Sequence, residues 1–186
     1  MKKGCFSENC KEEKCEADGV LIDFITGEEA ADTVVERIRQ DAERFLVEKK
    51  DYSKGDIEVK KEFEIVLGGE KLKLRADLII RVWGRRVIIV KCTYDSLGSK
   101  ERLIVSYARL LDSYQIPYAV IINAEGAEVL DTSSGEVIGS GMESIPAKGD
   151  LDIDELEFTE LPEDRLEKEK RILSAFESLD EALCGK

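Results

Sequence analysis

Two short apolar segments separated by one helix-length segment constrain the fold of this chain most. Residues 87–90 (Val-Ile-Ile-Val) and 118–122 (Tyr-Ala-Val-Ile-Ile) lack an alternation of polar and apolar side chains, so we expect both to be buried strands. The residues between them carry apolar side chains at helical spacing over 99–115, and Pro117 ends that helix. A helical connection is typical of a crossover, so the two strands should be parallel.

Two further strands are expected before this unit. Residues 57–67 and 72–82 alternate between apolar and polar side chains, and Gly68-Gly69 between them is a two-residue hairpin signal. Trp83-Gly84 then turns the chain into the buried segment at 87–90. These three strands should therefore form an antiparallel meander.

Helices are expected before and after the strands. We expect the first helix to begin at Thr26, with Glu29 completing a capping box, and to end near Lys50. A small hairpin over 127–138 follows the second buried strand, and a last helix begins at Pro162. The sequence therefore predicts an α/β fold with a mixed central sheet flanked by helices and an extra C-terminal helix.

The composition fits one domain with a substantial core. The chain has 186 residues, of which 42% are apolar and 37% are charged. We divide it into a flexible cysteine-containing tail (1–19), the domain proper (20–140), an acidic linker (141–161) and the C-terminal helix (162–186). No apolar run approaches the ~18–20 residues of a membrane helix, and the N-terminus lacks the apolar stretch of a secretory signal. We expect a cytoplasmic protein with no membrane contact.

The charge is strongly acidic overall but locally basic. The 28 Lys and Arg residues against 41 Asp and Glu give a net charge of -13, which excludes nucleic-acid binding by bulk attraction. Between residues 71 and 91 the only acid is Asp77. This basic island is either a DNA-binding surface or a set of solvated strand faces. Its candidate nucleic-acid-binding residues are Lys73, Arg75, Arg81, Arg85 and Arg86.

Histidine is absent, so any catalysis must use other side chains. The three evenly spaced cysteines Cys5, Cys10 and Cys15 are candidate ligands of Zn²⁺ or an iron–sulfur cluster. Their spacing is not the two-residue gap of common zinc knuckles, and the alternative is a redox-labile tail. The odd total of five cysteines argues against a disulfide framework.

The order of elements, with several short segments, resembles the restriction-endonuclease-like, or PD-(D/E)xK, nuclease superfamily. In particular it is similar to the N-terminal nuclease domain of type I restriction enzyme motor subunits and to small stand-alone relatives. The resemblance covers roughly residues 28–140. The matching segments are 36–40, 45–48, 56–59, 75–80, 90–92 and 116–118.

The resemblance implies a Mg²⁺-dependent phosphodiesterase site. In that family a helical Glu, a strand Asp and a Glu on the next strand gather the metal, and a Lys two positions later activates water or steadies the phosphate. Glu36 matches the helical acid and Asp77 the strand Asp. Lys91 stands at the position of the metal-binding Glu, and Thr93 at that of the Lys. Tyr107 matches a family Tyr, although Leu103 replaces the Gln that often precedes it.

The lysine at the acid position has a physical consequence. Ile89, Lys91 and Thr93 share one face of their strand, so Lys91 points at the site whichever register is chosen. An ammonium in place of a carboxylate changes the local charge by two units. We therefore predict an ion pair of Lys91 with Asp77 or Glu36, and no tight Mg²⁺ binding.

Three functions remain open on the sequence. The first is a non-catalytic module that interacts with nucleic acid or protein. The second is an active Mg²⁺-dependent DNA endonuclease in which Asp95 or Glu101 replaces the missing acid. The third is a metal or redox protein organised by the N-terminal cysteines. The apolar stripe of the C-terminal helix either packs on the domain or binds a protein partner; its residues are Leu166, Leu173, Phe176, Leu179 and Leu183.

Overall fold

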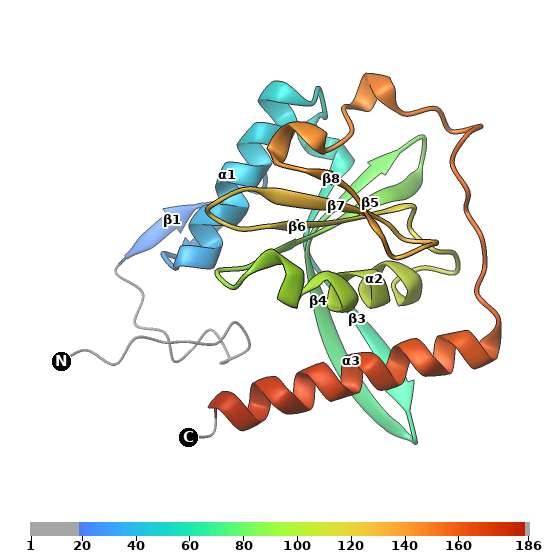
Figure 1. Cartoon of the computed structure of the whole chain (residues 1–186). Helices are drawn as coiled ribbons and strands as arrows, with labels where there is room; N and C mark the ends of the chain where they lie inside the picture. Colours follow the sequence, from blue (N-terminus) through green and yellow to red (C-terminus); the bar gives the residue numbers. More distant parts are fainter. Residues whose placement is uncertain (1–18, 185–186) are drawn as a thin grey trace.

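The computed structural model describes the backbone of residues 19–184 and the side chains of residues 19–176. Its centre is a six-stranded mixed sheet with helices on both faces (Figure 1). The strands follow one another across the sheet in chain order. They are β3 (Ile57–Leu67), β4 (Glu70–Val82), β5 (Arg85–Cys92), β6 (Tyr118–Ile122), β7 (Ala127–Asp131) and β8 (Val137–Ser140).

The sheet confirms the predicted pairing. β3, β4 and β5 form an antiparallel meander, and β5 pairs with β6 in parallel. Residues 87–90 of β5 are fully buried, as their unbroken apolar pattern predicts for a central strand. Gly68 and Gly69 connect β3 and β4 with φ of 60° and 88°, the left-handed conformation that a two-residue hairpin turn of this type requires.

Three helices cover the two faces of the sheet. They are α1 (Val34–Lys49), α2 (Glu101–Leu110) and α3 (Glu163–Cys184). Leu46 of α1 packs with Leu78 and Val90 on one face, whereas Ile104 of α2 packs with Ile79 and other side chains on the opposite face. The predicted α/β architecture with an extra C-terminal helix is therefore confirmed (Figure 1).

The predicted start of the first helix is wrong. Residues Val20–Ile22 (β1) and Glu29–Ala31 (β2) form a separate two-stranded sheet, and Thr26 lies in the turn between them. Asp23 stabilises this turn because its Oδ1 accepts hydrogen bonds from the backbone N–H groups of residues 25 and 26. The helix instead begins after Thr33, whose hydroxyl accepts a hydrogen bond from the Glu36 N–H at 3.1 Å.

The second helix is shorter than predicted. α2 ends at Leu110, and the chain then turns so that the N–H of Ile116 donates to the carbonyl of Ala108 at 2.9 Å. A single 3₁₀ turn, η3 (Leu97–Ser99), precedes the helix. The apolar spacing continues past Leu110, but the turn directs Ile116 into the core before β6 begins.

The segment interpreted from sequence as an acidic linker contributes to the core. Ile145 and Leu151 are buried beneath α1 and the sheet. The hydroxyl of Tyr52, itself buried, donates to the Pro146 carbonyl at 2.9 Å. The segment carries two further 3₁₀ turns, η4 (Met142–Ser144) and η5 (Lys148–Asp150), and η2 (Lys54–Asp56) precedes β3.

The C-terminal helix is anchored to α2 by one buried carboxylate. Glu169, 2% exposed, accepts hydrogen bonds from Arg102, Ser106 and Arg109. Leu173 is fully buried in the same contact. The described part of the apolar stripe therefore packs on this chain; the side chains of residues 179 and 183 lie outside the described residues. Over the described residues, no helix has the length and apolar character needed to cross a membrane.

Candidate functional site

Charged side chains occupy neighbouring positions across the middle of the sheet. The β3–β4 register places Lys60 opposite Asp77, because Val59 pairs with Leu78 and Lys61 with Ala76. The β4–β5 register, continued by one residue, places Asp77 opposite Lys91. Adjacent strands are about 4.8 Å apart, so two lysine positions flank the one aspartate position.

Asp77 is held by an ion pair with Lys91. The Lys91 Nζ lies 3.3 Å from the Asp77 Oδ2, and both side chains are largely buried. The same oxygen accepts a hydrogen bond from the Cys92 N–H at 2.8 Å. The predicted ion pair is confirmed, with Asp77 rather than Glu36 as the partner of Lys91.

Glu36 is engaged by three different side chains. Its carboxylate accepts hydrogen bonds from Arg39, through Nε and Nη2, and from the Gln40 amide at 3.2 Å. The Lys60 ammonium lies 3.2 Å from the Glu36 Oε2. Both oxygens of this buried carboxylate are therefore satisfied within the protein.

Arg39 lies at the centre of a buried carboxylate cluster that we define as Asp23, Glu36 and Glu43. Its Nη2 donates to the Asp23 Oδ2 at 2.6 Å and to Glu36, and its Nη1 donates to Glu43. Arg39 is 1% exposed and Glu43 fully buried. One guanidinium thus serves three carboxylates in a low-dielectric environment.

Burial has opposite net outcomes for the pKa values of Glu43 and Asp23. Burial raises the pKa of Glu43 to about 7, because Arg39 only partly offsets the desolvation and the charges of Asp23 and Glu36 add to it. Burial also acts on Asp23, but hydrogen bonds from the Thr26 N–H and Arg39 outweigh it and hold the Asp23 pKa below its ordinary value. Glu43 therefore changes charge near neutral pH.

We expect Glu43→Gln to remove a pH dependence of stability. The folded protein binds the Glu43 proton more tightly than the unfolded chain, whose value is 4.5. Stability therefore falls as pH rises from about 5 to about 7, and the penalty is complete above that range. At pH 8 the variant should be more stable than the wild type by roughly 1–2 kcal/mol.

Urea denaturation at several pH values measures this difference. Glu48→Gln, an exposed position on the same helix, is the control and should follow the wild-type curve. Parallel wild-type and Glu43→Gln curves between pH 5 and 8 would contradict the expected titration of Glu43.

Two residues matched to the family site are buried in structural roles. Thr93 is fully buried, and its hydroxyl accepts a hydrogen bond from the Asp95 N–H at 2.9 Å. Tyr107, 4% exposed, packs edge-to-face on Phe63 with 5.3 Å between ring centroids. Neither side chain is accessible to a substrate in the structure.

The acids considered as replacement ligands lie in different surroundings. Asp95 forms an ion pair with Lys100 at 3.2 Å. Glu101 is the first residue of α2. The pKa of Glu128 in β7 is raised, mainly by burial and additionally by the negative charge of Glu101. By register Glu128 lies opposite Ile121, which lies opposite Lys91. Ile121 therefore lies between Glu128 and Lys91 in the sheet.

The basic island is divided between two ends of β4. Lys73 and Arg75 lie on the far part of the β3–β4 hairpin, and Arg81 lies roughly 25 Å along the strand from Lys73 at ~3.3 Å per residue. Arg85 and Arg86 begin β5 beside Arg81. The island is therefore two separate surfaces rather than one.

The candidate cysteine ligands Cys5, Cys10 and Cys15 lie outside the described residues. Within the part of the chain that the structure describes, no group of three or more Cys, Asp or Glu side chains is arranged to hold a metal ion.

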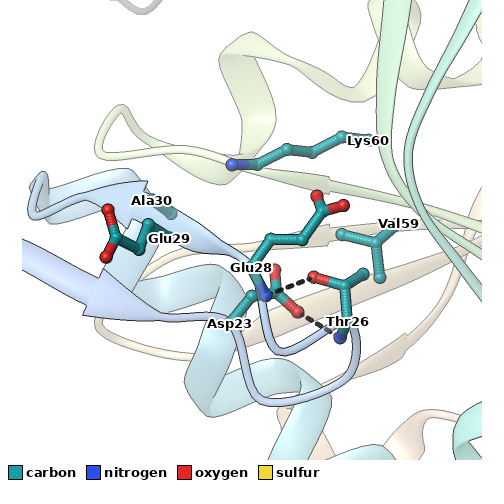
Figure 2. A pocket seen from close by; sticks show the side chains of 7 residues that line it. All are labelled: Asp23, Thr26, Glu28, Glu29, Ala30, Val59 and Lys60. Atoms are coloured by element: carbon teal, nitrogen blue, oxygen red, sulfur yellow. Dashed lines mark hydrogen bonds between the residues drawn. The ribbon is translucent and has the colours of Figure 1, made fainter.

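A pocket of about 60 Å³ lies between the β1–β2 hairpin and β3. Figure 2 shows Lys60 extending over it from β3. The lining residues are Asp23, Thr26, Glu28, Glu29, Ala30, Val59 and Lys60.

Sequence reasoning did not single out Asp23, Arg39 or Lys60. A signal for Arg39 was present, because Glu36, Arg39 and Glu43 recur at helical spacing beside the apolar stripe of α1. Lys60 has a φ of 50°, unusual for a side-chain-bearing residue in a strand, and no short-range pattern predicts it. The partner of Asp23 lies 16 positions away, beyond the reach of local patterns.

Comparison with known proteins supports the resemblance seen in the sequence. Residues 35–146 match the family described as type I restriction enzyme R protein N terminus. Among solved structures the chain is similar to one described as "Crystal structure of SSO0001", at 19% identity and a TM-score of 0.33. That match spans 54% of this chain and 53% of the other, about half of each. No curated protein matches. The family match covers more than half of the chain and includes Glu36, Asp77 and Lys91, so the protein belongs to the family of type I restriction enzyme R protein N-terminal domains.

Proposed function

We propose that this domain is a non-hydrolytic member of its family that serves as an interaction module. The observation that carries the proposal is the Lys91 ammonium 3.3 Å from Asp77, at the position where the resemblance implies a metal-binding Glu. An ammonium has no lone pair to give to a metal, and it already neutralises the carboxylate that remains.

The residues present do not fit a Mg²⁺ site. Mg²⁺ takes hard oxygen ligands and binds through carboxylates that are free to reach it. Asp77 is paired with Lys91, and both oxygens of Glu36 are used by Arg39, Gln40 and Lys60. Asp77 and Glu36 therefore each have a cation of the protein itself at the place where a metal would bind.

An interaction role is consistent with what the chain retains. The sheet is complete and its core is closed, so the fold does not depend on the lost acid. Fold alone does not determine function, and the surfaces must supply it. At the β4–β5 end of β4, Arg86 is neutralised by Glu58 and Asp112, whereas Arg85 has no carboxylate partner among the described residues.

A cleavage assay tests the proposal. Purified protein is incubated with supercoiled plasmid and with single-stranded DNA in the presence of Mg²⁺ or Mn²⁺, beside an Asp77→Ala variant. We expect no metal-dependent nicking above the level of that variant. Nicking that requires metal and disappears in Asp77→Ala would overturn the proposal. It would instead favour an active endonuclease with a replacement acid, for which Asp95, Glu101 and Glu128 would be substituted in turn.

A further inference from the structure

The only tryptophan of the chain lies in the β4–β5 turn and is exposed. Trp83 has 55% of its surface accessible and a φ of 51°. With Gly84, whose φ is 79°, it forms the two-residue turn between the paired residues Val82 and Arg85. Asparagine is the residue this turn position favours, whereas a bulky aromatic side chain is strained there. Neither packing in the core nor the geometry of the turn accounts for a tryptophan at this position.

The three arginines beside Trp83, Arg81, Arg85 and Arg86, outnumber the two carboxylates that pair with them. Arg86 binds Glu58 through Nε and Nη2 at 2.9 and 3.0 Å. Arg86 also binds Asp112 at 3.2 Å, and Arg81, about half exposed, lies 3.7 Å from the Glu58 carboxylate, so two acids face these two guanidinium groups. Arg85 stacks over the ring of Phe158 at 4.6 Å and, among the described residues, has no carboxylate partner.

We propose that the β4–β5 turn, defined as Arg81, Trp83 and Arg85, binds single-stranded nucleic acid. An unpaired base stacks on the Trp83 indole, and the guanidinium groups of Arg81 and Arg85 bind the adjacent phosphates. This identifies a surface and a ligand for the proposed interaction role, on which the inference rests.

The geometry favours a single strand over other ligands. A tryptophan on a protruding turn reaches a base that is already unpaired, whereas the bases of a duplex are stacked and inaccessible to it. Tryptophan and arginine are also frequent in protein interfaces. Against a protein ligand, the excess of guanidinium groups beside Trp83, on a chain of net charge -13, matches a repeating array of phosphates.

The fluorescence of the single tryptophan reports directly on this surface. The full-length protein is titrated with a short oligothymidine at low salt with EDTA, so that no metal-dependent cleavage contributes. We expect saturable quenching of Trp83, weakened steeply by added salt. A polyglutamate of similar charge should not quench. Absence of quenching by the oligonucleotide, or equal quenching by polyglutamate, would overturn the inference and, in the second case, indicate an acidic protein ligand.

Substitutions distinguish phosphate binding by the arginines from base stacking on Trp83. With a fluorescently labelled oligothymidine and anisotropy detection, Arg81→Gln and Arg85→Gln should each weaken binding by about 3- to 10-fold and reduce its salt dependence. Trp83→Asn should weaken binding by roughly 10-fold through lost stacking. Because asparagine suits the turn, the same variant should unfold at a temperature a few degrees higher.

Arg44 provides a matched control away from the β4–β5 turn. Arg44 is 46% exposed in its side chain, like Arg81 at 48%, but lies on α1. Arg44→Gln should bind the oligonucleotide as the wild type does. Equal losses in Arg44→Gln and Arg81→Gln would contradict a site at the turn. The EDTA arm is independent of the cleavage assay, so cleavage would overturn the non-hydrolytic proposal while leaving this one in place.

Discussion

Replacing Lys91 with glutamate is expected to make the stability of this fold depend on divalent metal. Without metal, Lys91→Glu brings two carboxylates together at a buried position, and the loss of the ion pair should cost about 3 kcal/mol. Mn²⁺ can then bind between the two acids and offset their repulsion. At a metal concentration about 100 times the dissociation constant, binding adds about 2.7 kcal/mol. Thermal unfolding with and without Mn²⁺ measures the change.

A second substitution distinguishes the effect of losing the Lys91 cation from the effect of gaining a carboxylate ligand. Lys91→Met also breaks the ion pair with Asp77 but supplies no oxygen, so it should be destabilised without rescue by Mn²⁺. The wild type should show no shift. Equal responses of all three proteins to Mn²⁺ would mean that the metal binds elsewhere and that the Lys91 position is not the vacated acid position.

Replacing Arg39 with methionine is expected to be the most damaging single substitution in α1. It removes the guanidinium that Asp23, Glu36 and Glu43 share and leaves three carboxylates buried together. Breaking a buried ion pair on one side costs about 3–5 kcal/mol. The deficit should shrink as pH falls toward about 7, because the loss of Arg39 raises the pKa of Glu43 further and the variant protonates this carboxyl at a higher pH than the wild type does.

Controls make the Arg39 prediction specific. Arg39→Lys keeps the charge but loses the forked geometry, so it should lie between the wild type and Arg39→Met. Arg44→Met, on the exposed side of the same helix, should change stability by less than about 0.5 kcal/mol. Urea denaturation at pH 5.5 and 8 measures all three. A deficit of Arg39→Met that is the same at both pH values would contradict the proposed role of the carboxylate cluster.

The elements that local pattern predicted are those whose partners lie close in the sequence. The Gly68-Gly69 turn set the β3–β4 register, and the unbroken apolar run of β5 indicated its central position. The parallel pairing of β5 and β6 followed from the helix between them. The start of α1 was mistaken because Thr26 and Thr33 both precede acids at capping-box spacing, and the pairing of β1 with β2 places Thr26 in a turn instead.

The site could be predicted in part for the same reason. Side-chain alternation predicted that Lys91 points at the site to which the family resemblance assigned Asp77, and the structure joins the two residues. The contact of Glu36 with Arg39 had a signal in the helical spacing, but its contact with Lys60 could not be predicted, because Lys60 is a distorted strand residue. Neutralisation of both acids is thus a property of the folded sheet rather than of any one motif.

Isothermal titration calorimetry of the wild-type protein with Mn²⁺ tests the central claim most directly. The claim is that Lys91 and Lys60 occupy the charge positions that a metal would need beside Asp77 and Glu36. The expected result is no saturable heat at pH 7.5, and the same trace for Asp77→Ala. A one-to-one binding isotherm that Asp77→Ala abolishes would contradict the claim and place a metal at this site.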